Sequence, residues 1–169
     1  MKTLVLSALT VFACAIASSG HAQDYDSRAD QKVMNGYRVH SATTYYSNAI
    51  GHAEALESYA NEKTGISPET AKEHVNGVRQ YVNASSKELA KLEATTRSDK
   101  EAQALIAGIK THQGHAMESC NMVESECVKQ RIDGVVLASC CTNMSKELKA
   151  ADALHDKLLK HLKIVPATK

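Results

Sequence analysis

The sequence predicts an all-α protein, an antiparallel up-down four-helix bundle that follows an N-terminal signal peptide. Three observations support this prediction. Apolar residues recur at helical spacing along four long segments, helix start and stop signals separate those segments, and no segment alternates apolar and polar residues as a strand does. Four similar helices with short connections are typical of an up-down bundle.

The first 22 residues have the layout of a secretory signal. One lysine precedes an apolar run from Leu4 to Ala17, and small residues follow up to Ala22. The run is shorter than the roughly 20 apolar residues that span a bilayer, so we expect no membrane span in the mature chain. We expect cleavage near Ala22, a mature protein that begins at Gln23, and a periplasmic or extracellular location. A lipoprotein modified at Cys14 is disfavoured, because the apolar run continues past that residue.

Residues 23–169 amount to one domain, and helix signals divide them into segments at roughly 27–64, 67–95, 98–130 and 133–164. Gly65 stops the first helix, and Ser67 caps the second. Ser98 and Glu101 are predicted to form a capping box at the third helix, and Asp133 caps the fourth.

Each predicted helix carries an apolar stripe that we expect to face the core. On the first helix the stripe is Tyr45, Ala49, His52, Leu56 and Tyr59, with Ile50 and Ala53 beside it. On the second it is Ala71, Val75, Val78, Val82, Ser85, Leu89 and Leu92. On the third it is Leu105, Ile109, His112, Ala116, Cys120, Val123 and Cys127. On the fourth it is Leu137, Cys141, Met144, Leu148, Ala151, His155, Leu158 and Leu162.

Charge and motif content exclude several classes of function. The chain has 20 basic and 19 acidic residues with no basic stripe, which argues against a nucleic-acid partner. It contains no HExxH, no CxxCH, no nucleophile elbow and no Glu-x-x-His of the di-iron type. The sequence therefore favours a binding protein over an enzyme.

A cluster of soft-metal ligands is the main functional signal. Residues 112–127 read HQGHAMESCNMVESEC, with two histidines, two methionines and two cysteines. A rise of about 1.5 Å per residue places several of these at the height of ligands on the other helices. We therefore predict a core site for copper(I) first and zinc(II) second, since thiolate, thioether and imidazole suit these ions. Its primary ligands are Cys120, Cys140 and Cys141, and its secondary ligands are His52, His74, Met117, Met144 and Cys127.

Within this cluster, Cys120 is expected to face Cys141 across the third and fourth helices. His112 and His115 have the spacing of a helical chelate. Only His112 lies on the predicted stripe, so His115 is expected to face solvent and the pair is a weak signal. In architecture and ligand type alone, the chain resembles exported copper-storage bundles with inward cysteines, although only four of its cysteines follow the signal.

Two other functions fit the same pattern. The first is a non-metal structural, stress or interaction bundle of the cell envelope, with a Cys120–Cys141 disulfide and another envelope protein as partner. The second is a b-type haem carrier that uses His155 and either Met34 or His40 as axial ligands.

Overall fold

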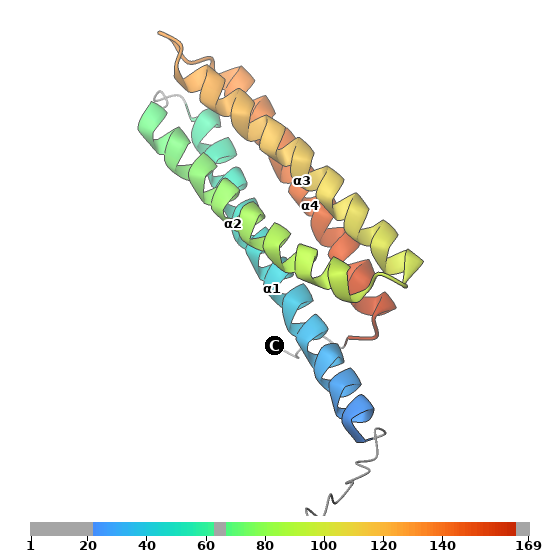
Figure 1. Cartoon of the computed structure of the whole chain (residues 1–169). Helices are drawn as coiled ribbons and strands as arrows, with labels where there is room; N and C mark the ends of the chain where they lie inside the picture. The colour runs from blue at the N-terminus through green and yellow to red at the C-terminus, as the bar shows by residue number, and fades with distance from the viewer. Residues whose placement is uncertain (1–21, 63–66, 165–169) are drawn as a thin grey trace, which may run out of the picture.

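The structure is a computed structural model that describes residues 22–62 and 67–164, with the side chains of the first helix described from Asp30 onward. Within these residues the chain forms four α-helices and no β-strand. The helices are α1 (Ala22–Asn61), α2 (Pro68–Thr95), α3 (Lys100–Cys127) and α4 (Gly134–His161). They pack side by side as a four-helix bundle, and α1, with 40 residues, projects beyond the other three at its N-terminal end (Figure 1). The predicted all-helical fold with four helices is confirmed.

The N-terminal predictions fall largely outside this part of the chain. The signal peptide up to His21 and the alternative lipid site at Cys14 lie outside the described residues. Among the helices that are described, none combines the length and the apolar character needed to cross a membrane.

The start of α2 follows the signals in the sequence. The Ser67 hydroxyl accepts a hydrogen bond from the Thr70 N–H at 3.4 Å, which satisfies one of the free donors of the first turn. Pro68 occupies the first helical position, where its missing N–H is not needed. Glu69 adds a negative charge near the positive end of the helix dipole.

The start of α3 differs from the prediction. Asp99, not Ser98, is the cap, and its carboxylate accepts a hydrogen bond from the Ala102 N–H at 3.0 Å. Glu101 lies 3.3 Å from the His161 ring at the end of α4. The capping box predicted for Ser98 and Glu101 is therefore wrong, because with Asp99 as the cap Glu101 stands one residue before the N3 position that a capping box requires.

At α4 the predicted cap is correct and the predicted end is too late. The Asp133 carboxylate accepts hydrogen bonds from the N–H groups of Val135 and Val136 at 2.9 and 3.3 Å. Lys163 adopts a φ of 53°, and the following Ile164 N–H bonds to the Leu159 carbonyl. This left-handed turn closes the helix at His161 instead of at residue 164.

The core stripe of α2 agrees with the prediction at every position, whereas those of α1 and α3 are partly displaced by one residue. Tyr46 is buried in place of Tyr45, and Gln113 is buried in place of His112. Gln113 is held there because its Oε1 accepts a hydrogen bond from the Ser86 hydroxyl of α2 at 2.9 Å. His112 consequently lies at the flank of α3, next to α4.

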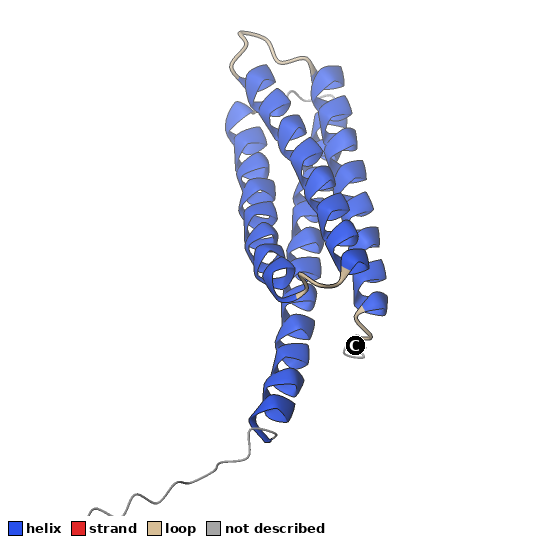
Figure 2. Cartoon of the chain, turned by 45° about the vertical axis from the view of Figure 1, so that its right-hand side comes forward, coloured by secondary structure: helices blue, strands red, loops and turns tan. Residues whose placement is uncertain are grey.

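Contacts between α3 and α4 run in opposite sequence order along the two helices. Near the start of α3, Asp99 contacts His161, and farther along Cys120 contacts Met144. The loop of residues 96–99 and the loop of residues 128–133 lie at opposite ends of the bundle (Figure 2). On the other side of α3, Arg79 of α2 binds Glu124 at 2.7 Å.

Candidate metal centre

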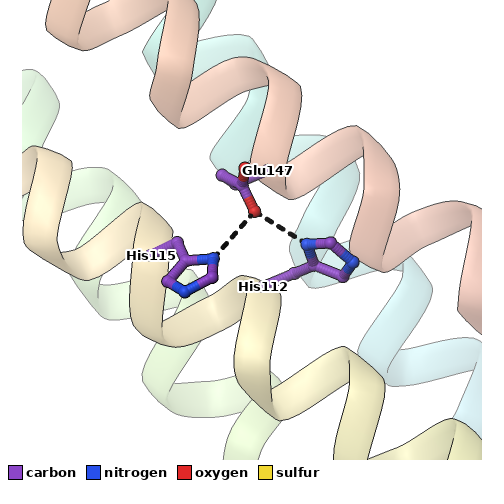
Figure 3. Close-up of side chains that lie close together, drawn as sticks. All are labelled: His112, His115 and Glu147. Atoms are coloured by element: carbon purple, nitrogen blue, oxygen red, sulfur yellow. Dashed lines mark hydrogen bonds and ion pairs between the residues drawn. The ribbon is translucent and has the colours of Figure 1, made fainter.

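Two histidines of α3 and one glutamate of α4 converge at the surface of the bundle. His112 and His115 are three residues apart, so their side chains leave the same face of α3. Glu147 reaches toward them from α4 (Figure 3). A single carboxylate oxygen, Oε2, lies 2.7 Å from His112 Nδ1 and 3.3 Å from His115 Nδ1. One potential ligand atom from each residue falls within 4.8 Å of the other two.

The electrostatics of this cluster favour an ionised carboxylate. The hydrogen bond from His112 is the main cause that lowers the pKa of Glu147, and the hydrogen bond from His115 lowers it further. The side chains of His112 and Glu147 are 33% and 23% exposed, and that of His115 is 53% exposed. An ion from solvent can therefore reach all three groups without unfolding of the bundle.

The ligand types in the cluster suit a borderline divalent ion. Two imidazole nitrogens and one carboxylate oxygen are a common protein set for zinc, at bond lengths of about 2.0–2.2 Å. An ion held by all three would replace the hydrogen bonds to Glu147, with the Nδ1 proton of each ring released or moved to Nε2. The three ligand atoms lie up to 4.8 Å apart, wider than the roughly 3.3 Å between two ligands of one zinc ion, so the side chains would rotate toward one another on binding.

The cysteines occupy a different environment, the closed core. Cys120 and Cys141 are fully buried, Cys140 and Cys127 are nearly so, and all four are free thiols. Cys120 Sγ contacts Met144 Sδ at 3.8 Å. The disulfide of the structural-bundle hypothesis is absent from the described residues.

Burial keeps these thiols protonated. Desolvation raises the pKa of Cys120 to about 11 and that of Cys141 to about 12. Negative charge on the neighbouring Cys140 would raise the pKa of Cys141 further. Because the thiolate is the form that binds metal, an ion at this position must displace protons from groups that hold them tightly.

The remaining predicted ligands separate from the cysteines. His52 of α1 and His74 of α2 face each other, with their Nδ1 atoms 3.3 Å apart. Met117 is half-buried and packs against the edge of the core. Among the eight predicted ligands, Cys120 contacts Met144, and His52 pairs separately with His74 on α1 and α2.

The histidine of the haem hypothesis is enclosed. His155 is fully buried, its ring centroid lies 4.8 Å from that of Tyr46, and burial lowers its pKa to about 4. Its two ring nitrogens have no hydrogen-bond partner among the described residues. Of the two proposed second axial ligands, Met34 is exposed and His40 is half-buried on α1.

Sequence reasoning identified the spacing of His112 and His115 but missed Glu147. A glutamate at the flank of a helix has the same local pattern as a solvated one, and only the alignment of α3 with α4 brings it to the histidines. The sequence signal that could have indicated Glu147 was the His-x-x-His spacing together with a carboxylate at the same height on the next helix.

No protein-family model matches this sequence, and neither a curated protein nor a solved structure shows significant similarity to it. The function is therefore inferred from the side chains and their geometry.

Proposed function

We propose that this chain is an exported, antiparallel up-down four-helix bundle that binds a borderline divalent metal ion, zinc(II) first, through His112, His115 and Glu147. One observation carries the proposal: two imidazoles of α3 approach the same carboxylate oxygen of α4. Three protein ligands leave further coordination positions to water or to a partner molecule. The proposed role is to bind or pass on the ion outside the cytoplasm, and it includes no catalytic step.

The preference for zinc over copper(I) at this cluster follows from ligand type and protonation. Nitrogen and oxygen donors suit zinc, whereas copper(I) prefers sulfur. The ionised Glu147 is available at neutral pH, while the raised pKa of Cys120 and Cys141 leaves those sulfurs protonated. Metal binding at the exposed cluster therefore costs less free energy of deprotonation than metal binding at the buried thiols.

Copper(I) at the core sulfurs is the second candidate function, with Cys120, Cys140, Cys141 and Met144 as ligands. The observation that favours it is the 3.8 Å separation of Cys120 Sγ and Met144 Sδ. Metal–sulfur bonds of about 2.3 Å in a tetrahedral arrangement separate two sulfurs by about 3.8 Å. Copper(I) bound here must release one proton for each thiolate formed, so its affinity should rise steeply with pH.

The export proposal is supported by the order of lysine, apolar run and small residues up to Ala22. The antiparallel arrangement is supported by the opposed order of the α3 and α4 contacts.

A non-metal envelope bundle remains the alternative function, and it predicts that no ion affects the folded state.

Zinc titration by calorimetry of the reduced protein tests the proposal. Glu147→Gln removes the shared anionic ligand with little change in volume, and we expect zinc affinity at this cluster to fall by about tenfold to a hundredfold or more. The matched control is Glu118→Gln, which alters an exposed glutamate of the same helix as the two histidines. A Cys120→Ser/Cys141→Ser variant should keep the affinity. If the cysteine variant loses zinc binding and the Glu147→Gln variant keeps it, the zinc site lies at the core sulfurs and not at this cluster.

A further inference from the structure

The histidine pair on α1 and α2 has the geometry of a second ligand set. His52 and His74 are 22 residues apart in sequence, yet their Nδ1 atoms lie 3.3 Å apart across the two helices. The rings meet edge to face, with centroids 5.5 Å apart. No residue of this pair belongs to α3 or α4, which hold His112, His115 and Glu147.

The spacing of the two nitrogens matches that of metal-bound imidazoles. Zinc–nitrogen bonds of about 2.0–2.1 Å at a tetrahedral angle separate two nitrogens by about 3.3–3.4 Å. In the metal-free protein the same spacing allows one Nδ1–H to donate to the other Nδ1. Binding of an ion needs only that this proton move to Nε2 of its ring, so two neutral imidazoles can bind with no net proton release.

The surroundings of the pair leave room for an ion and its other ligands. An open groove of about 490 Å³ is lined by His52 but not by His74, and its polar lining includes Glu69, Glu73, Asn76 and Gln80 together with the cation Lys72. His52 and His74 are both only partly buried, so an ion from solvent can reach their rings. Within the described residues no carboxylate completes a three-ligand group with these two rings, so the open groove would let water fill the remaining coordination positions.

Gly77 of α2 fixes where the His52 ring lies. A Cβ atom at position 77 would stand 2.6 Å from two atoms of that ring, closer than any side chain tolerates. The ring therefore rests on the bare backbone of α2, one turn from His74. A glycine in a helix interior destabilises the helix relative to alanine, and here it permits the approach of the two imidazoles.

We propose that His52 and His74 form a second site for a borderline divalent cation, bound through both Nδ1 atoms at the groove between α1 and α2. This site is separate from the one on α3 and α4 and uses a different pair of helices. The two sites together would give the bundle a capacity of two ions.

The test uses zinc and a His112→Gln/His115→Gln background, which removes the imidazoles of the α3 site. In a sample with ¹⁵N-labelled histidine, we expect this double variant to take up one zinc equivalent. The Nδ1 resonances of His52 and His74 should shift on zinc addition, and further replacement by His74→Gln should abolish uptake. His40→Gln, which alters a half-buried histidine elsewhere on α1, is the control and should have no effect.

The outcomes separate this proposal from the α3–α4 site. If the double variant takes up no zinc, or takes it up with no shift of the two Nδ1 resonances, the second site is overturned. The α3–α4 site is tested independently by the loss of zinc binding in the Glu147→Gln variant relative to the wild type. If zinc uptake by the wild type is abolished by His74→Gln and unaffected by Glu147→Gln, the second site stands and the α3–α4 proposal fails.

A pair of glycine variants tests the same proposal without removing any ligand. Gly77→Ala forces the His52 ring away, whereas Gly51→Ala, adjacent to His52 in sequence, meets nothing within 4 Å. Both substitutions raise helix propensity, so their effects on stability have the same cause. Gly77→Ala should weaken zinc binding in the double variant by at least about tenfold, and Gly51→Ala should leave it unchanged. Equal affinity in the two glycine variants would contradict the proposal.

Discussion

Asp99 both caps α3 and binds the last residue of α4. Its carboxylate accepts a hydrogen bond from the Ala102 N–H, while His161 Nε2 lies 2.8 Å from Oδ2. The hydrogen bond from Ala102 is the main cause that lowers the pKa of Asp99, and the hydrogen bond from His161 is the second. One side chain therefore joins the start of one helix to the end of the next.

Asp99→Ala should lower the free energy of unfolding by about 1 kcal/mol at pH 7, the usual loss for a helix cap. Because the pKa of Asp99 is lowered by folding, its contribution is full above the unfolded value of about 3.9 and disappears as pH falls through the folded value. Urea unfolding at pH 7 and pH 3 measures both quantities. The matched control is Ser98→Ala, the cap predicted from sequence, which should change stability by less than about 0.5 kcal/mol. A larger loss at Ser98 than at Asp99 would contradict the observed cap.

His155 should remain neutral until the solution is strongly acidic. Burial lowers its pKa to about 4, whereas an imidazole in an unfolded chain titrates near 6.5. The neutral ring is favoured by folding, so its contribution to stability is full above about pH 6.5 and is lost as pH falls from there to about 4. Histidine ring NMR across this range measures the protonation directly. A midpoint near 6.5 for His155 would mean that its ring is solvated.

The four buried thiols should react slowly and in order of exposure. Cys120 and Cys141 are 0% exposed, Cys140 is 2% exposed and Cys127 is 5% exposed, so an alkylating reagent should modify Cys127 before the other three. The raised pKa of Cys120 and Cys141 lowers their thiolate fraction and slows the reaction further. Peptide mass spectrometry at timed intervals, with urea-unfolded protein as the reference, gives each rate. Rapid labelling of Cys141 in the folded protein would disagree with its position in the core.

The helices were largely predictable because their signals are local. Ser67 and Asp133 cap helices as expected, since a cap depends on residues within one turn. The stripe of α2 was also predictable, because small or aliphatic residues occupy every inward position. On α3, by contrast, His112 and Gln113 are adjacent polar residues, and sequence periodicity favoured the wrong one. The hydrogen bond from Ser86 of α2, a contact between helices, holds the Gln113 side chain inward.

The candidate site was less predictable because it depends on contacts between helices. Inward cysteines were expected, and Cys120 and Cys141 are indeed buried. The consequence of that burial, a raised pKa that opposes metal binding, emerges only from the surrounding packing. Glu147 carried no sequence signal of its own, since its place beside His112 and His115 follows from the register of α4 against α3.

Zinc K-edge X-ray absorption of the reduced protein tests the central proposal most directly, because it identifies the atoms bound to the ion. With one zinc equivalent added, we expect only nitrogen and oxygen neighbours at about 2.0–2.2 Å, with the multiple-scattering pattern of imidazole. In a His74→Gln background, which removes the proposed α1–α2 site, Glu147→Gln should abolish this signature or lower the imidazole count. A sulfur shell at about 2.3 Å in the wild type would contradict the assignment and place the ion among the core cysteines.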